Sequence, residues 1–144
     1  MNVQKILDGK SIQSVETISP QETLSAAVSI LSTRKIGALI VSDGGSGVGG
    51  ILSERDIVRR LAEDGAACLS TPVSAAMTRK VLSCEPNDTA VSILQRMTDG
   101  RFRHMPVLSE GNLIGVISIG DVVKARMAEI EMENRAMEDM IKGL

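Results

Sequence analysis

Two segments of the chain carry apolar residues at helical spacing, and each segment follows a threonine. After Thr23 the apolar positions are Leu24, Ala27, Val28 and Leu31, and after Thr89 they are Ala90, Val91, Leu94 and Met97. Steps of three and four residues put such side chains on one face of a helix, and threonine is a common N-cap. The pattern therefore predicts two capped amphipathic helices at corresponding places in the two halves of the chain.

Short β-like stretches surround each predicted helix. In the first half, one stretch stands before a proline at residues 14–18, and two more follow the helix at 38–41 and 48–52. In the second half, the corresponding stretches are at 81–84, 105–108 and 113–117. Residues 43–47 and 109–112 hold the glycine and polar residues that are typical of turns in antiparallel hairpins. A second helix is expected to begin at Ser53 and at Ser118. Each half thus reads strand, helix, strand, strand, helix.

The two halves also repeat each other in sequence. Pro20 and Thr23 have counterparts in Pro86 and Thr89, and the motif at residues 50–56 has its counterpart at 115–121. A unit of about 60 residues buries too little surface to be more than marginally stable alone. We therefore expect an α+β fold in which two β-α-β-β-α repeats share one core, with a linker near residues 65–72.

Composition and charge narrow the possible functions. The chain of 144 residues is 43% hydrophobic but has one Phe, no Trp and no Tyr, so its core must be aliphatic. A net charge of −2 argues against nucleic-acid binding through phosphates. No apolar run approaches the ~20 residues that span a bilayer, and residues 1–10 lack the apolar stretch of a signal peptide, so we expect a cytoplasmic protein with no membrane partner. Two Cys and one His make no convincing metal site, and two buried thiols are the expectation.

A Ser-x-x-Asp motif opens the second helix of each half, from Ser53 to Asp56 and from Ser118 to Asp121. One interpretation is a capping box, in which the serine and the acid satisfy free amides at the helix end. The other is a site for ribose and phosphate, because a helix N-terminus attracts anions and a carboxylate can accept hydrogen bonds from a ribose diol. Both interpretations stay open at this point, because a cap can exchange partners.

Basic residues stand in matching places before the first strand of each hairpin. They are Arg34 and Lys35 in the first half and Arg101, Arg103 and His104 in the second, with Arg55 inside the first motif. The planar guanidinium group suits phosphate, which favours a ribose-phosphate site. His104 is better explained as a hydrogen-bonded structural residue than as a catalytic one, because the sequence marks no nucleophile or paired acid for it. We therefore expect neither an enzyme nor a catalytic cofactor.

These motifs resemble a known family. Residues 50–56 (Gly-Ile-Leu-Ser-Glu-Arg-Asp) and 115–121 (Gly-Val-Ile-Ser-Ile-Gly-Asp) resemble the end of a CBS domain, which is named after cystathionine beta-synthase. Residues 36–41 and 103–108 resemble its middle strand, and residues 72–78 resemble the lead into a second repeat. The resemblance covers about residues 10–127, with repeats at 10–67 and 72–127 and a helical tail at 128–144. It implies a pseudo-twofold pair of repeats with two clefts between them.

The resemblance also implies an adenosine ligand in these clefts, with AMP expected and ADP, ATP, NAD(H) or S-adenosylmethionine as alternatives. Asp56 and Asp121 would hold the ribose hydroxyls, assisted by Ser53 and Ser118. Phosphate would be faced by Arg55, Arg103 and His104. The adenine would lie against Thr17, Ile18 and Ala38 in one cleft and against Ser83, Cys84 and Met105 in the other. Lys35, Gly37, Arg101 and Pro106 complete the predicted nucleotide-binding residues.

The function that the resemblance implies is that of a regulatory sensor. Family members are often attached to an enzyme, channel or transporter, but here almost no chain remains for an effector. The protein is therefore expected to act on a partner protein in trans or through its own assembly. The alternative is a structural adaptor whose clefts stay unoccupied. Residues 119–120 are Ile-Gly where the first repeat has Glu-Arg, so the two sites are expected to differ.

The chain after Asp121 is predicted to stay helical to near Lys142. In this segment, apolar residues and one polar residue follow one another in alternating steps of four and three, which is the pattern of a heptad seam. The residues of this seam are Val123, Met127, Ile130, Asn134, Met137, Ile141 and Leu144. The tail either self-associates through this seam, or it lies on its own domain or frays. Because CBS pairs generally dimerise side by side, a homodimer is expected in either case.

Overall fold

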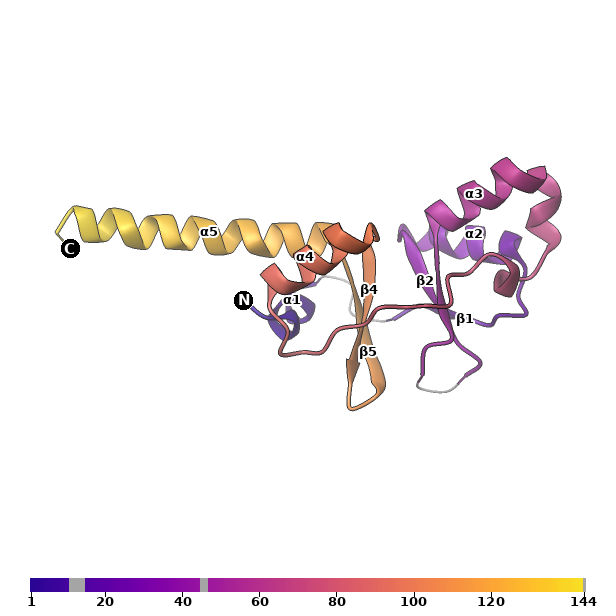
Figure 1. Cartoon of the computed structure of the whole chain (residues 1–144), viewed down its shortest axis with the longest axis horizontal. Coiled ribbons are helices and arrows are strands. Elements are labelled where there is room, and N and C mark those ends of the chain that lie inside the picture. The colour runs from indigo at the N-terminus through magenta and orange to yellow at the C-terminus, as the bar shows by residue number, and fades with distance from the viewer. Residues whose placement is uncertain (11–14, 45–46, 144) are drawn as a thin grey trace. The chain divides into compact units, whose positions relative to one another are not determined.

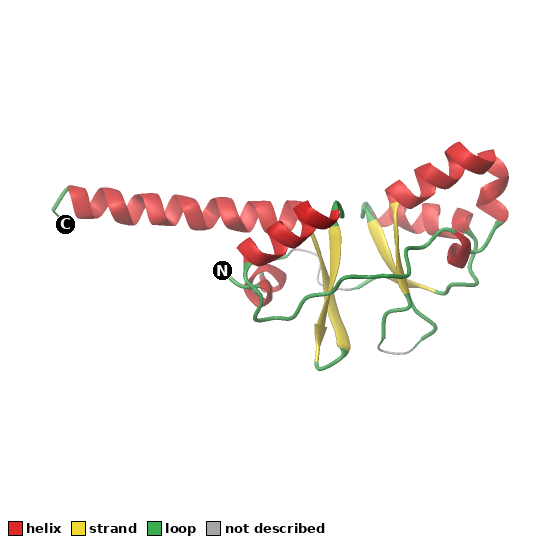
Figure 2. Ribbon diagram, in the orientation of Figure 1, coloured by secondary structure: helices red, strands yellow, loops and turns green. Residues whose placement is uncertain are grey.

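Helices and short strands alternate along the chain in the computed structural model, which describes residues 1–10, 15–44 and 47–143 (Figures 1 and 2). The first half contains α1 (Val3–Asp8), β1 (Thr17–Ile18), α2 (Leu24–Arg34), β2 (Ala38–Val41), β3 (Gly50–Ser53) and α3 (Glu54–Asp64). Two short 3-10 helices follow, η1 (Gly65–Ser70) and η2 (Val73–Ala75). The second half contains α4 (Ala90–Gly100), β4 (His104–Ser109), β5 (Asn112–Ser118) and α5 (Ile119–Ile141). The predicted α+β class with a C-terminal helix is confirmed.

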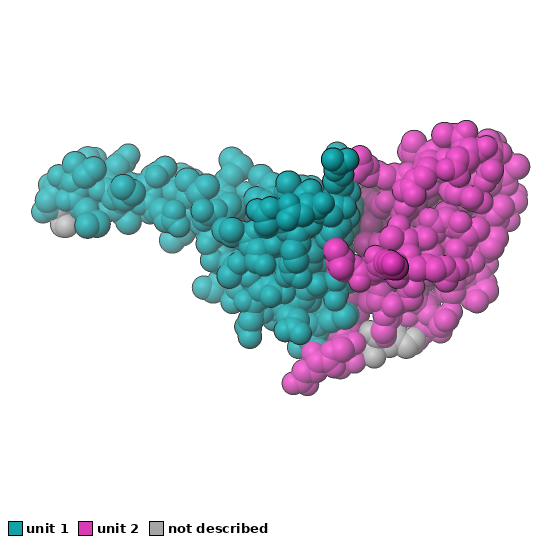
Figure 3. Space-filling model, viewed as in Figure 1, with its two compact units in different colours: residues 1–13, 83–109, 115–144 teal, residues 14–82, 110–114 magenta. Residues whose placement is uncertain are grey.

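The chain forms two compact units, which Figure 3 colours separately. The first-repeat unit consists of residues 14–82 and 110–114, and the second-repeat unit consists of residues 1–13, 83–109 and 115–144. Buried apolar residues form two separate clusters, one in each unit. Each unit thus has a buried apolar cluster, and a shared core and a pseudo-twofold relation between the repeats stay predictions.

A three-stranded sheet in the order β1-β2-β3 supports the first-repeat unit. Strand β1 runs parallel to β2 with Thr17 opposite Ile40, and β3 runs antiparallel to β2 with Ser53 opposite Ala38. The predicted strand 38–41 is confirmed, whereas the strand expected at 48–52 lies at Gly50–Ser53. The strand expected at 14–18 is described only for Thr17–Ile18, and Ser14 lies outside the described residues, as do Gly45 and Ser46 of the predicted turn.

The pair β4-β5 supports the second-repeat unit, and Glu110 and Gly111 connect the two strands. The strand expected at 81–84 is wrong in extent, because only Cys84 forms a bridge, to Val107 of β4. Leu82 is exposed and Pro86 follows closely, so the segment has neither the burial nor the length for a strand. The largest fully buried side chains of this unit include Ile93, Met97, Met105 and Ile117.

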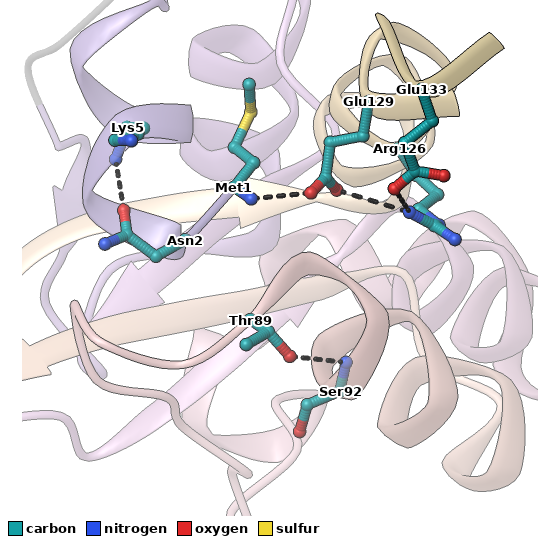
Figure 4. Close-up of polar contacts among 8 residues, drawn as sticks. All are labelled: Met1, Asn2, Lys5, Thr89, Ser92, Arg126, Glu129 and Glu133. Carbon is teal, nitrogen blue, oxygen red and sulfur yellow. Dashed lines mark hydrogen bonds and ion pairs between the residues drawn. The ribbon is translucent and has the colours of Figure 1, made fainter. Parts of the chain in front are cut away.

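Each repeat is completed by the segment that precedes the other repeat along the chain. Helix α1 was not expected from the sequence, and it packs Val3 and Ile6 into the core of the second-repeat unit. Its start is fixed by an Asn2–Thr89 bridge and by a hydrogen bond from the Lys5 N–H to Asn2 Oδ1 at 3.0 Å (Figure 4). The Met1 amino group donates to Glu129 Oε2 at 2.6 Å, which ties α1 to α5.

The corresponding segment of the first-repeat unit follows the first repeat. The segment expected to be the linker, residues 65–72, consists largely of the 3-10 helix η1, with Cys68 buried in the core of this unit beside Val73. After η2, the Ile51 and Thr78 backbones exchange two hydrogen bonds of 2.9 and 2.8 Å. We call α1 and the segment from η1 to Thr78 the exchanged segments. They bring additional apolar side chains to the buried cluster of each unit.

Helix α5 extends well beyond the core of its unit. Val122 and Ala125 are buried near its start, but the exposed fraction is 65% for Met127, 60% for Met137 and 82% for Ile141. The apolar seam of the tail is thus open to solvent along the described part of the helix, and the interpretation that the tail lies on its own domain is not supported. Leu144, the last predicted seam position, lies outside the described residues.

Candidate functional site

Both Ser-x-x-Asp motifs form capping boxes. In α3 the Ser53 N–H donates to Asp56 Oδ2 at 2.9 Å, and the Asp56 N–H donates to Ser53 Oγ at 3.4 Å. In α5 the corresponding distances, from the Ser118 N–H to Asp121 Oδ2 and from the Asp121 N–H to Ser118 Oγ, are 2.9 and 3.2 Å. The capping interpretation is therefore confirmed for both motifs, and any ligand must compete with or add to these contacts.

Asp56 is enclosed by donors of its own unit. Only 4% of this residue is exposed. Its Oδ1 accepts from Arg59 Nη2 at 3.0 Å and from Thr78 Oγ1 at 3.3 Å, and its Oδ2 also accepts from Ser53 Oγ at 3.1 Å. A buried carboxylate with this many donors is fully satisfied. A ribose diol would have to displace Thr78 or Arg59 to reach it.

Asp121 is more accessible and has a different cation beside it. Its side chain is 25% exposed, and Lys10 Nζ lies 2.9 Å from its Oδ2. Lys10 Nζ also donates to the Val116 carbonyl oxygen at 2.8 Å. Burial raises the pKa of Asp121, but the hydrogen bonds from Ser118 and the contacts with Lys10 outweigh it and hold the pKa below its ordinary value of 3.8. Asp121 is thus an anion at neutral pH.

The strands bring other predicted residues to the two helix N-termini. The Glu54 N–H donates to the Gly37 carbonyl oxygen at 3.1 Å, which places Gly37 and Ala38 beside the start of α3. In the second-repeat unit the Ile119 N–H donates to the Arg103 carbonyl oxygen at 2.8 Å, which places Arg103 and His104 beside the start of α5. The start of β2 or β4 therefore meets the helix N-terminus that carries the candidate aspartate.

The residues predicted to frame adenine lie mostly in the cores. Ile18, Cys84, Met105 and Pro106 are buried, Ala38 and Ser83 are half-buried, and Thr17 is exposed. The Cys84 N–H donates to the Pro106 carbonyl oxygen at 3.0 Å, and its own carbonyl oxygen accepts from the Leu108 N–H at 2.8 Å. Burial raises the pKa of the Cys84 thiol to about 12, so this cysteine is an unreactive core residue. The expectation of buried thiols is confirmed for Cys68 and Cys84.

The predicted cations are exposed, and two of them have unusual backbones. Lys35 ends α2 with φ 55°, and Arg101 ends α4 with φ 56°, both in the left-handed region that favours glycine. Within the described residues, Lys35, Arg55, Arg101 and Arg103 form no side-chain ion pair or hydrogen bond. Arg34 differs, because its Nε lies 3.3 Å from Glu16 Oε1.

Lys10, Thr78 and Arg59 touch the two aspartates but were not predicted. Arg59 stands three residues after Asp56 on one helix face, a spacing that is readable from the sequence. Nothing local in the sequence could have identified Lys10, because 106 positions separate it from Val116, which it contacts.

The described residues contain no group of three or more His, Cys, Asp or Glu side chains that could hold a metal ion. Among the same residues, no helix combines the length and the apolar character needed to cross a bilayer.

Comparison with known proteins gives consistent matches along the chain. The family model of the CBS domain matches residues 10–63 and 73–128. The chain is 35% identical over 126 residues to the mitochondrial CBS domain-containing protein CBSX3 of Arabidopsis thaliana, with 85% of this chain and 61% of that protein covered. A second Arabidopsis relative, CBSCBSPB1, is 29% identical over 131 residues, which cover 89% of this chain but 24% of the relative. The chain thus spans less than two thirds of the length of these relatives.

Solved structures show the same fold. The CBS-domain protein ATU1752 of Agrobacterium tumefaciens superposes with a TM-score of 0.84 and 46% sequence identity, covering 88% of this chain and 99% of that one. The CBS domain pair of protein MJ0100, solved in complex with 5′-methylthioadenosine and S-adenosyl-L-methionine, has a TM-score of 0.78 at 19% identity, covering 90% of this chain and 98% of that one. At that identity the second likeness concerns the fold alone.

Proposed function

Because the chain belongs to the CBS domain family and contains two CBS domains in tandem, we propose that it is a regulatory module that binds an adenosine phosphate, with AMP as the expected ligand. The observation that carries this proposal is the surroundings of Asp121. A partly exposed carboxylate stands at the N-terminus of α5, and the backbone of Arg103, an exposed residue directly before β4, accepts a hydrogen bond from the Ile119 N–H at the same helix start. A ribose diol and a phosphate need such a pair of opposite charges.

In the proposed complex the ribose hydroxyls donate to Asp121, and Arg103 and Arg101 face the phosphate. The Asp121 carboxylate is already ionised and oriented by Ser118, and the ribose hydroxyls would share its Oδ2 with Lys10. Arg101 is an exposed cation with a left-handed backbone, which glycine would adopt at a lower energetic cost. The presence of arginine there supports a role in binding rather than in folding. The adenine contacts expected from Thr17 and Ala38 in one cleft, and from Ser83 in the other, stay predictions.

The first-repeat site would bind more weakly. Its aspartate is buried and its oxygens already accept from Ser53, Arg59 and Thr78. A ligand there must break at least one of these contacts, each of which contributes about 1 kcal/mol or more when a charge is involved. We therefore propose that the second-repeat site is the principal one. The remaining assignments to Ser53, Arg55, Asp56, Lys35 and Gly37 stay predictions for the weaker site.

The exposed cations favour a phosphorylated ligand over other adenosine compounds. AMP, ATP and NAD(H) all bring negative charge, whereas S-adenosylmethionine brings a positive sulfonium. The adenosine compounds bound to MJ0100 support the adenosine part of the ligand but not its charge. Binding would act through a homodimer or on a partner protein in trans, and not through catalysis by this chain. The cytoplasmic location expected from the sequence belongs to the same proposal.

A structural adaptor is the second candidate, and one observation favours it. Both motifs are accounted for as capping boxes, and Asp56 needs no ligand to be satisfied. An adaptor would leave the sites unoccupied and use only the exposed faces of the helices.

Calorimetric titration separates the two candidates. The wild-type protein is titrated with AMP, ATP, NADH, S-adenosylmethionine and, as a control, GMP. The variant Asp121→Asn keeps an oxygen for the cap but loses the charge, and Asp139→Asn in the exposed tail is the matched control. We expect AMP to bind to the wild type and to Asp139→Asn, and binding to weaken at least tenfold in Asp121→Asn. Equal binding to all three proteins would refute the role of Asp121, and no binding of any ligand would favour the adaptor.

A further inference from the structure

Lys10 is held firmly at the carboxylate of Asp121 by the segment that precedes the first repeat. Its N–H donates to the Leu7 carbonyl oxygen at 3.1 Å, directly after α1, and α1 is anchored by the buried residues Val3 and Ile6. Its ammonium contacts Asp121 Oδ2 at 2.9 Å and the Val116 carbonyl oxygen at 2.8 Å, and its side chain is 25% exposed. A cation from a remote part of the chain is therefore placed within the second-repeat site.

Among the residues of the first-repeat unit that the structure describes, no cation from the segment after η1 contacts Asp56. There the same role is shared by Thr78, a neutral residue of that segment, and by Arg59, which lies on α3 itself. On α5 the residue three positions after Asp121 is Lys124, which is exposed and, among the described residues, forms no ion pair or hydrogen bond with Asp121. The positive charge beside Asp121 thus depends on Lys10, whereas the charge beside Asp56 belongs to its own helix.

We propose that Lys10 determines the charge specificity of the second-repeat site, so that the site accepts adenosine compounds with a phosphate and discriminates against neutral or cationic ones. The inference rests on the proposed binding of ribose at Asp121. A ribose diol that donates to both oxygens of Asp121 shares Oδ2 with Lys10 and weakens the existing ion pair. A phosphate on the same ligand gives Lys10 a replacement anion. A nucleoside offers no replacement, and a sulfonium adds a like charge.

The experiment compares the affinities of AMP and adenosine for four proteins by calorimetric titration. The variant Lys10→Met removes the charge but keeps an apolar stem, and Lys10→Arg restores the charge. Lys5→Met is the matched control, because Lys5 is an exposed cation on helix α1, which directly precedes Lys10. Circular dichroism checks that each variant is folded, and Lys10→Gln replaces Lys10→Met if the latter fails to fold.

The ratio of the adenosine dissociation constant to that of AMP is the decisive quantity. We expect Lys10→Met to lower this ratio about tenfold, chiefly by weakening AMP, which corresponds to ~1.4 kcal/mol. Lys5→Met should leave the ratio unchanged, and Lys10→Arg should restore most of it. A purely structural role for Lys10 would change both affinities equally, and that result, or an unchanged ratio, would overturn the inference. Failure of both ligands to bind to the wild type would refute the proposed ribose site and the inference with it.

Discussion

Gly50 and Gly115 test the exchange of segments between the repeats, because each lies against the segment that completes its unit. A Cβ atom on Gly50 would lie 2.9 Å from Met77 Sδ and 2.9 Å from the Thr78 carbonyl oxygen. A Cβ atom on Gly115 would lie 2.7 Å from Leu7 Cδ2. The two glycines occupy corresponding positions, but only Gly50 faces backbone. We therefore expect Gly50→Ala to destabilise the protein more than Gly115→Ala.

The size of each effect follows from what must move. In Gly50→Ala the Thr78 backbone has to shift, which strains its two hydrogen bonds with Ile51 and the contact of Thr78 with Asp56. Overpacking of this kind costs about 1–3 kcal/mol, and each weakened hydrogen bond adds up to about 1 kcal/mol. We expect a total near 3 kcal/mol, or a fall in Tm of roughly 9 °C for a chain of this length. In Gly115→Ala a terminal methyl group of Leu7 can rotate away, so the cost is about 1 kcal/mol or less.

Thermal and urea unfolding followed by circular dichroism measures both effects, since the chain has no Trp or Tyr to report by fluorescence. Gly47→Ala is the control, because a Cβ there meets nothing within 4 Å. In the double variant Leu7→Ala with Gly115→Ala, the loss should be smaller than the sum of the single losses, because the clash is removed. Equal losses for Gly50→Ala and Gly115→Ala, or a stable Gly50→Ala protein, would refute the packing described here.

Three further predictions concern charge, backbone and assembly. Because the folded-state pKa of Asp121 is lowered, its contact with Lys10 stabilises the protein by about 1 kcal/mol at pH values above the unfolded-state pKa near 3.8. This contribution is lost as the pH falls through the lower folded-state pKa. The difference in urea stability between wild type and Lys10→Met should therefore vanish well below pH 3.8. Arg101→Gly should raise the free energy of unfolding by about 0.5 kcal/mol, because glycine relieves the left-handed backbone, while calorimetry should show weaker AMP binding. Met137→Glu on the seam of α5 should weaken self-association, measured by light scattering, whereas Met132→Glu off the seam should not. Equal effects of the two substitutions would exclude the seam as the interface.

Local sequence patterns were sufficient to predict most of the secondary structure. The N-caps Thr23, Thr89, Ser53 and Ser118 all cap the predicted helices, because each cap depends only on residues three positions away. The weaker predictions were those for the edges of the sheets. Residues 81–84 have β-forming side chains but make a single bridge, since the partner strand and the burial that would extend it come from tertiary packing.

The core and the exchange of segments could not be read in the same way. The helical spacing of Val3, Ile6 and Leu7 after Asn2 was a signal for α1 that could have been recognised. The sequence does not show which repeat α1 packs against, because the local pattern of a short helix is the same for either repeat. Tertiary contacts, including those with Gly115 and Thr89, determine that α1 completes the second-repeat unit.

The same limit explains why the two aspartates looked equivalent in the sequence and differ in the structure. Both motifs have the same spacing and form the same capping box, so the local rule is satisfied twice. The difference arises from the exchanged segments, which bring neutral Thr78 to Asp56 and cationic Lys10 to Asp121. Asp56 is consequently buried with its oxygens fully engaged, while Asp121 keeps a quarter of its side chain open to solvent. A duplicated motif can therefore have its carboxylate fully engaged in one repeat and partly open to solvent in the other, and the residues that make this difference lie largely outside the motif.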